Sequence, residues 1–186
     1  MKKQLNLLNE IVEKGSHSLV GKQVFPIGKS TPDHRTPLDL FYSLGDFDLD
    51  VAASKDNTLC QYYFDENDDG LKQSWKAKRV WCNPPYSEIG KWIKKAINET
   101  YYEKHCDEVV LLLPGRTCTK WFREAWTHAS RIAFVHVRLN FSGPNMIQDS
   151  KANAPFPSVI IHIDRNFNGD QPEVVLVGRN GQSLED

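Results

Sequence analysis

The sequence predicts an α/β fold, an open sheet with helices on both faces, and two observations support this fold class. Near-continuous apolar strands alternate with amphipathic helices in the second half of the chain, and residues 79–113 read as a β-α-β unit. Strands that are apolar on both sides are typical of a sheet that is covered on both faces. In such a sheet the ligand lies beyond the carboxyl ends of the strands, which here are Asp50, Asn83 and Pro114.

The second half of the chain supplies the regular elements of this sheet. The strand at 79–82 ends at a proline-rich turn, and a helix with Ile89, Ile93, Ala96 and Ile97 facing inward follows. A returning apolar segment after the last loop is expected to pair as a hairpin. The predicted elements are a helix at 87–103, a strand at 108–113, a helix at 118–128, a strand at 131–137 and the returning strand at 154–163.

The first half is less regular. An apolar stripe predicts a helix over 4–14, and a segment rich in Gly, Ser and Pro predicts an irregular arm over 15–34. Thr36 and Pro37 then predict the start of a short helix, with Thr36 as its N-cap. A buried strand is expected at 47–52 and irregular structure at 54–78. We therefore expect an N-terminal helix and irregular arm over 1–32 and one globular domain, which would carry the function, over 33–186.

Composition limits the classes of protein that remain. A chain of 186 residues with 40% hydrophobic and 11% aromatic residues is long enough for one globular domain with a sizeable core. No apolar stretch is long enough for a membrane span, and polar residues follow the Met1 start, so we expect a cytoplasmic protein without membrane contact. The four cysteines and six histidines show no metal-ligand spacing, which predicts reduced thiols and no metal site.

The charge pattern leaves nucleic-acid binding open. A formal net charge of −1 gives no global basic signature. Basic residues nevertheless follow two neighbouring strand ends at helical spacing, which suits either a solvated helix face or a phosphate contact. These residues are Lys91, Lys94 and Lys95, and Arg116, Lys120 and Arg123.

The segment Asn83-Pro84-Pro85-Tyr86 directly follows the strand at 79–82. Proline cannot donate to a strand ladder and disfavours helix at the residue before it, so the strand must end and the chain must turn here. The two prolines stiffen the turn, while Asn83 supplies an amide and Tyr86 an aromatic ring. A stiff turn with polar and aromatic ends predicts a binding pocket, although a purely structural turn would use the same prolines.

With these residues in view, the chain resembles the small phage and prophage DNA N6-adenine methyltransferases, which belong to the S-adenosylmethionine-dependent Rossmann-like class. The resemblance covers about residues 33–163, and its most specific part is the Asn-Pro-Pro-Tyr motif of amino methyltransferases. The other matching segments occur in the same order. They are TPLDLF at 36–41, LDVAAS at 49–54, DDGL at 68–71, VWCNPPYS at 80–87, LLPGRT at 112–117 and APFPSVII at 154–161.

The resemblance implies a chemical role for each residue of the motif. The N6 nitrogen of adenine is a poor nucleophile because its lone pair is delocalised into the ring. In the resembled family, the side-chain oxygen at the Asn83 position and the carbonyl of Pro84 accept the two N6 hydrogens, while Pro85 helps to fix that carbonyl. Tyr86 would stack on the base, which must be flipped out of the duplex to reach the pocket.

The resemblance also assigns cofactor contacts, with S-adenosyl-L-methionine as the expected cofactor. Asp50 stands where the class has the acidic residue of its first motif, but the usual glycine-rich loop is replaced by Ala52, Ala53 and Ser54. Thr36 and Pro37 would lie beside the cofactor, although they also suit a helix start. The pair Asp68 and Asp69 would contact its adenine or ribose, although a solvent-exposed acidic turn explains these two residues equally well. The short interval from Asp50 to Asn83 predicts shortened strands.

DNA is the expected partner, and its contacts are predicted in the loops 114–120 and 138–155. The candidate residues are Arg116, Thr117, Lys120, Arg138 and Asn140, with an ion-pair role at the sheet edge as the alternative for Arg138.

Two other functions stay open from the sequence. One is methylation of another amino group, either cytosine N4 or a protein glutamine, although the glutamine enzymes carry a glycine-rich loop and an extra helical domain. The other is a non-catalytic nucleic-acid binder that has the fold without the cofactor, for which the DVAAS loop is the main support.

Overall fold

The structure, a computed structural model, describes residues 36–139 and 156–184 together with the backbone of residues 22–23. The predicted helix at 4–14, most of the arm at 15–34 and Asn140 lie outside the described residues. The division at residue 32 therefore stays a prediction. Within the described residues, no helix has the length and apolar character needed to cross a membrane.

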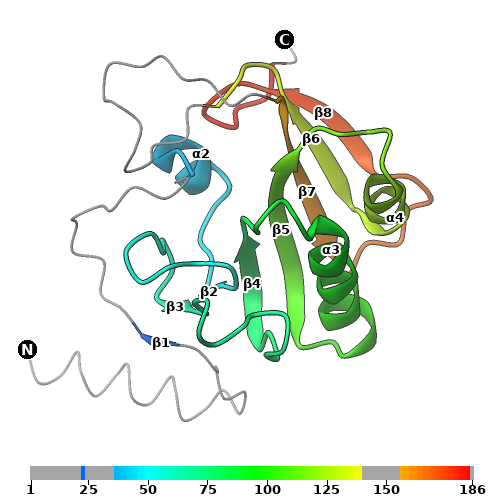
Figure 1. Ribbon diagram of the computed structural model, residues 1–186. Helices are drawn as coiled ribbons and strands as arrows, with labels where there is room; N and C mark the ends of the chain where they lie inside the picture. The colour runs from blue at the N-terminus through cyan, green and yellow to red at the C-terminus, as the bar shows by residue number, and fades with distance from the viewer. Residues whose placement is uncertain (1–21, 24–35, 140–155, 185–186) are drawn as a thin grey trace, which may run out of the picture.

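The described chain forms one sheet of eight strands in the order β1-β3-β2-β4-β5-β7-β6-β8, with helices packed against it (Figure 1). The strands are β1 (Lys22–Gln23), β2 (Leu49–Asp50), β3 (Tyr62–Tyr63), β4 (Ala77–Cys82), β5 (Cys106–Pro114), β6 (Arg131–Val135), β7 (Ser158–Asp164) and β8 (Glu173–Val177). The helices are α2 (Leu38–Ser43), α3 (Ile89–Ile97), α4 (Lys120–His128) and a π-helix, Asn98–Tyr102.

Most of the sheet is parallel. β3, β2, β4 and β5 run in the same direction, and β6 pairs in parallel with β8. β7 runs antiparallel between β5 and β6. β1 is an outermost strand of the sheet and runs antiparallel to β3. The carboxyl ends of β2, β4 and β5 therefore meet at one edge of the sheet, which is where a ligand is expected. This arrangement confirms the predicted α/β class and is consistent with a Rossmann-like methyltransferase fold.

Helices lie on both faces of the sheet, as the apolar strands predict (Figure 1). α3 and α4 cover one face, and α3 buries Ile89, Ile93, Ala96 and Ile97, the residues expected to face inward, together with Trp92. α2 packs on the other face through Leu40 and Phe41, whose ring meets Trp81 of β4 edge-on at 5.2 Å. Apolar packing on each face explains why the central strands are buried almost completely.

Several element boundaries differ from the sequence prediction. The helix expected at 87–103 stops as α3 at Ile97 and continues as the π-helix. The strand expected at 131–137 ends at Val135, because its pairing with β7 and β8 stops there, so Arg138 lies beyond the strand. The segment 54–78, expected to be irregular, contains the short strand β3, and β8 was not predicted at all.

The prediction for the start of α2 was wrong in its N-cap. The helix begins at Leu38 and its N-cap is Pro37, with no side-chain cap. The side chain of Thr36 instead contacts Asn83, which explains why this threonine does not cap the helix.

The interval between Asp50 and Asn83 is shortened in the way its length suggests. β3 has two residues, and the acidic turn that follows approaches Val51, the residue directly after β2. Gly70 in this turn is so close to the Val51 carbonyl that an added Cβ would lie 2.1 Å from its oxygen, so a larger residue would force the turn away. The Trp75 indole donates a hydrogen bond to the Gly70 carbonyl over 2.8 Å, which holds the turn in place.

Candidate active site

The candidate site lies at the sheet edge where β2 and β4 end. Asp50 is the last residue of β2, and Asn83 directly follows β4. Val51 and Trp81 are joined by a backbone hydrogen bond of 3.1 Å, so the two strand ends are held side by side. A cavity of about 40 Å³ opens between them, and its lining residues are Thr36, Asp50, Ala52, Asn57, Leu59, Trp81 and Asn83.

The side-chain amide of Asn83 is held between two polar neighbours. Its Nδ2 donates to the Thr36 hydroxyl over 3.3 Å, and its Oδ1 accepts from the Tyr86 hydroxyl over 3.3 Å. An acceptor on one side and a donor on the other fix which end of the amide faces which direction. Both distances are long for hydrogen bonds, so each of these two bonds is weak.

The Asn-Pro-Pro-Tyr turn places its aromatic ring beside a second one. The Tyr86 ring meets the Phe156 ring edge-on, with 5.5 Å between centroids, and the Arg116 guanidinium lies 5.6 Å from the centroid of the Phe156 ring. A hydrogen bond of 2.7 Å from the Gly115 N–H to the Pro157 carbonyl ties these segments together. Burial raises the pKa of the Tyr86 hydroxyl, so this group stays neutral.

Asp50 is a buried carboxylic acid, and burial raises its pKa to about 7. The Ala52 N–H donates to its Oδ1 over 3.2 Å and partly opposes this effect. Within the described residues no cationic side chain pairs with Asp50. A buried carboxylate without a cation favours a ligand that brings a positive charge.

The loop after β2 is built without glycine. The Asn57 side chain accepts a hydrogen bond from the Ser54 N–H over 2.6 Å, and the Ser54 carbonyl accepts from the N–H groups of Asn57 and Thr58. These bonds close a compact turn in which Ala52 lines the cavity, whereas Ser54 does not. The small side chain of Ala52 therefore leaves space beside the end of β2, as a glycine would in a glycine-rich loop.

The predicted acidic contacts lie in the turn after β3. Asp68 is half-buried, and its carboxylate accepts a hydrogen bond from the Asp65 N–H over 3.0 Å. Asp69 pairs with Lys72 at 2.8 Å, and this hydrogen bond lowers the pKa of Asp69. Neither residue lines the cavity beside Asp50, so the structure does not bring this pair together with Asn83.

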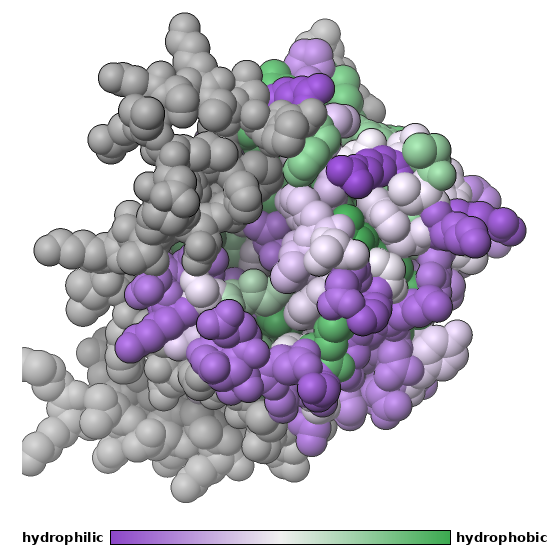
Figure 2. All heavy atoms as spheres, viewed as in Figure 1, coloured by the Kyte–Doolittle hydropathy of each residue, from purple (hydrophilic) through white to green (hydrophobic). Residues whose placement is uncertain are grey.

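The predicted DNA contacts occupy two places. Arg116 and Thr117 are exposed in the loop between β5 and α4, and Lys120 is exposed as the first residue of α4, all at the same sheet edge as Asn83. Arg138 is also exposed, beyond the end of β6. In Figure 2, hydrophilic residues cover much of the visible described surface on the side of α3 and α4.

Comparison with known proteins adds a family to this geometry. The profile of the family described as DNA N-6-adenine-methyltransferase (Dam) matches residues 29–185, which is most of the chain. The chain belongs to the Dam family. The matched range includes both strand ends and the Asn-Pro-Pro-Tyr turn.

Two phage proteins are similar to this Dam family chain. The DNA N-6-adenine-methyltransferase of Escherichia phage T1 is 36% identical over 122 residues, which are 60% of this chain and 50% of that protein. The protein of the same name from Haemophilus phage HP1 (strain HP1c1) is 32% identical over 89 residues, which are 48% of this chain and 50% of that protein. The chain thus spans about half the length of the curated relatives that it matches.

Four residues of the site were not identified from the sequence of this Dam family member, and one of them is Trp81, which lines the cavity from strand β4. Asn57 and Leu59 line the cavity from a loop that was expected only to be irregular, and Phe156 contacts Tyr86 from the far end of the chain. Phe156 lies in the segment APFPSVII, so its position in that segment was the one available signal. Within residues 36–139 and 156–184, no group of His, Cys, Asp and Glu forms a metal site.

Proposed function

We propose that this protein transfers a methyl group from S-adenosylmethionine to the N6 nitrogen of adenine in DNA. The observation that carries the proposal is the position of Asn83, which directly follows β4 and lines the same cavity as Asp50. The membership of the chain in the Dam family supports the same reaction. The names of the two phage relatives support DNA adenine as the substrate.

Asp50 is the residue best suited to hold the cofactor. S-adenosylmethionine, when bound, supplies the methyl group on a positively charged sulfur. Its amino group is also cationic, and the buried Asp50 carboxylate, which has no cationic partner among the residues that the structure describes, would gain one when such a group binds. Thr36, Pro37 and the small side chain of Ala52 would border the same ligand, whereas Asp68 and Asp69 would reach only a part of it that extends past β3.

Asn83 and Pro84 would position the nitrogen that is methylated. The Asn83 Oδ1 and the Pro84 carbonyl would accept the two N6 hydrogens, which would draw the nitrogen lone pair out of the ring. The nitrogen would then take the methyl group that S-adenosylmethionine supplies, with the uncharged thioether as the leaving group. Fixed acceptors aimed at a developing charge are worth several kcal/mol in a dry site.

Tyr86 would offer its ring face to the extruded adenine. Tyr86 meets Phe156 edge-on, and stacking of a base on the Tyr86 ring would be worth about 1–3 kcal/mol. Arg116 and Thr117 lie on the neighbouring loop and Lys120 begins α4, where the three side chains would contact DNA phosphates. Arg138 and Asn140 stay candidates for the same role.

The test is incubation with methyl-labelled S-adenosylmethionine and duplex DNA, followed by nucleoside analysis. The proposal expects labelled N6-methyladenine, and it expects no change when a chelator is added. Labelled N4-methylcytosine, or label in protein glutamine, would show that the pocket methylates another amino group. Calorimetry without DNA should show cofactor binding, and its absence would favour a non-catalytic nucleic-acid binder.

A further inference from the structure

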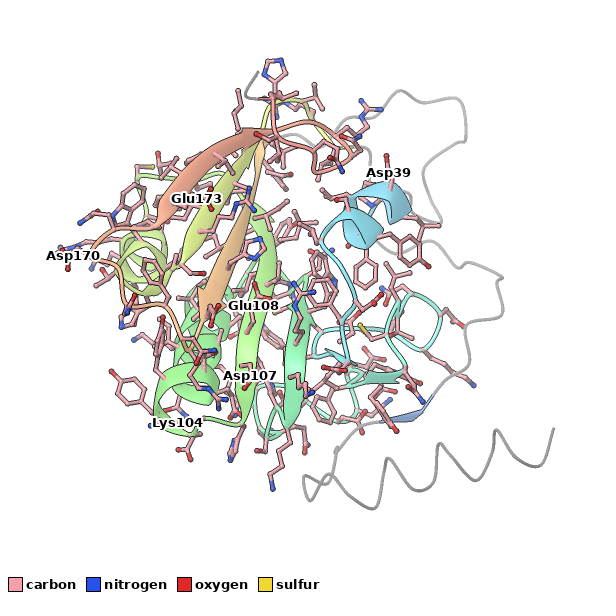
Figure 3. All side chains as sticks on the ribbon, turned by 180° about the vertical axis from the view of Figure 1, so that it is seen from behind. Asp39, Lys104, Asp107, Glu108, Asp170 and Glu173 are labelled. Atoms are coloured by element: carbon pink, nitrogen blue, oxygen red, sulfur yellow. The ribbon has the colours of Figure 1, made fainter. Side chains whose placement is uncertain are left out.

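A second and larger cavity lies on the sheet face opposite α3 and α4. Its volume is about 400 Å³, within the range of about 300–1,000 Å³ that is usual for small-molecule sites. None of its lining residues lines the cavity beside Asp50. Figure 3 looks onto this face, with Glu108 labelled on β5 and Glu173 on β8. The cavity is therefore separate from the proposed site of methyl transfer.

A row of charged and polar side chains crosses the sheet along one side of this cavity. Each residue of the row comes from a different strand, and register or a direct contact links each to the next. In spatial order the row is Arg79 on β4, Glu108 on β5, His162 on β7, Arg131 on β6 and Glu173 on β8. Charges placed across five strands are unusual in a sheet whose other central residues are apolar.

One half of this row is fully paired. Arg79 donates to Glu108 over 2.6 Å, to the carbonyls of Asp46 and Leu44, and lies over the Phe47 ring. The other oxygen of Glu108 lies 2.7 Å from Nδ1 of His162. Burial acts to raise the pKa of Glu108, but the hydrogen bonds from His162 and Arg79 outweigh it and lower the pKa. Each side-chain nitrogen of Arg79 and each carboxylate oxygen of Glu108 thus already has a partner within the protein.

The other half of the row is not paired in this way. The buried Nε of Arg131 lies 3.2 Å from a Glu173 oxygen but has no hydrogen-bond partner. Within residues 36–139 and 156–184, its Nη atoms make no hydrogen bond, and neither does Nε2 of His162. The Glu173 side chain is 62% exposed, so water can solvate its carboxylate when the guanidinium contacts something else. Arg131 is therefore the donor that the cavity offers to a ligand.

The floor of the cavity is apolar. Ala133 and Ile160 lie one same-face step along their strands from the charged row, and Val177 lies two such steps from Glu173 on β8. All three are buried on the α2 side of the sheet. Ala133 has the small side chain that leaves the space open. The cavity thus combines an apolar floor with a guanidinium at its side.

We propose that this cavity binds a small ligand that has an apolar or aromatic body and one oxyanion, either a carboxylate or a phosphate. The Arg131 guanidinium holds the oxyanion through its Nη atoms, since its planar fork matches both groups. The body of the ligand lies on Ala133, Ile160 and Val177. The ligand is a separate one from the substrates of methyl transfer.

The test is calorimetric titration of the full chain with benzoate, phenyl phosphate and benzamide, three probes that share one ring. We expect at least one anion to bind about tenfold or more tightly than neutral benzamide, and the tighter anion identifies carboxylate or phosphate as the natural group. Arg131→Gln should weaken that anion about tenfold or more. The control Arg123→Gln, on the exposed side of α4, should not change its affinity.

A second measurement needs no variant and keeps the proposal testable if Arg131→Gln fails to fold. In NMR titrations of the unaltered protein, the ring signals of His162 should shift with the bound anion and not with benzamide. The proposal is overturned if neither anion binds below about 10 mM. It is also overturned if folded Arg131→Gln binds both anions as the parent does, or if the His162 signals stay unchanged at saturation.

Discussion

Asn83 and Thr36 lie 47 positions apart in the sequence, and the Asn83 Nδ2 donates a hydrogen bond to the Thr36 hydroxyl over 3.3 Å. Thr36 is 7% exposed, so its hydroxyl is directed into the protein. The bond turns the Asn83 Oδ1 toward Tyr86 and the proposed substrate position. Thr36 is therefore a positioning residue for Asn83 in the proposed reaction.

Thr36→Val tests this positioning role. Valine has the shape of threonine but no acceptor, so the Asn83 amide loses the contact that orients it. One lost hydrogen bond of this kind costs about 0.5–1.5 kcal/mol, which predicts a fall in kcat of roughly two- to tenfold with KM for DNA unchanged. Thr127→Val, on the exposed side of α4, is the matched control. A normal kcat for Thr36→Val would show that Asn83 is oriented by other contacts.

Tyr86 makes two contributions that substitutions can separate. Tyr86→Phe keeps the ring but removes the hydroxyl that donates to Asn83, so we expect a rate several-fold lower with unchanged DNA affinity. Tyr86→Ala should lose about 1–3 kcal/mol of base affinity, measured by DNA titration. The control is Tyr102→Ala, because Tyr102 is 71% exposed and remote from the site. The stacking role is excluded if folded Tyr86→Ala melts earlier but binds and methylates DNA normally.

Asp50→Asn should make the free protein more stable at high pH. Burial raises the pKa of Asp50 from 3.8 to about 7. Between these two pH values the folded state therefore keeps a proton on Asp50 that the unfolded state has lost. Stability conferred by this group is therefore lost as pH rises from about 4 to 7. Above pH 7 the asparagine variant avoids a cost on the order of a few kcal/mol.

Thermal unfolding at pH 5 and pH 8 measures this effect. The melting temperature of Asp50→Asn should exceed that of the parent by more at pH 8 than at pH 5, while Asp170→Asn, an exposed control, should show no such trend. The same variant should bind S-adenosylmethionine more weakly, because the cationic amino group loses its partner. Equal cofactor affinity would remove Asp50 from the proposed cofactor site.

Glu99 stabilises the end of the sheet away from Asn83, where the strands β4 and β5 begin. Its buried carboxylate accepts hydrogen bonds from the Trp75 N–H and Lys95 and contacts His105. Burial acts to raise its pKa, but these partners outweigh it and lower the pKa, so its stabilisation is lost as pH falls. Glu99→Ala should cost about 3–5 kcal/mol of unfolding free energy in urea, with normal activity of the folded fraction. A variant as stable as the parent would contradict this.

The sequence predicts those parts of the fold that depend on long local patterns. The inward face of α3 and the strands β4 and β5 follow from apolar periodicity, and the positions of Asp50 and Asn83 at strand ends follow from the same pattern. β3 and β8 were missed because their pairing is set by neighbouring strands, and two-residue β3 has no pattern of its own. The N-cap of α2 was predicted wrongly because Thr36 contacts Asn83 instead, a long-range bond.

In the candidate site, too, residues with a local sequence signal were predicted and residues placed by long-range packing were not. The Asn-Pro-Pro-Tyr turn carries its own signal, since two prolines force a strand to end. Asn57 and Phe156 carry no comparable signal, because each joins the site through tertiary packing from a distant segment. The raised pKa of Asp50 also depends on burial, which a strand-end position alone does not predict.

The most direct test of the proposed function is the single-turnover rate of Asn83→Ala on adenine-containing duplex DNA with S-adenosylmethionine. Removal of one fixed acceptor for the N6 hydrogens predicts a rate about a hundred- to a thousandfold below that of the parent. Melting temperature and cofactor affinity should stay close to parental values, because Asn83 is only partly buried. If folded Asn83→Ala methylates adenine as fast as the parent, the Asn-Pro-Pro-Tyr turn is structural and the proposed mechanism is wrong.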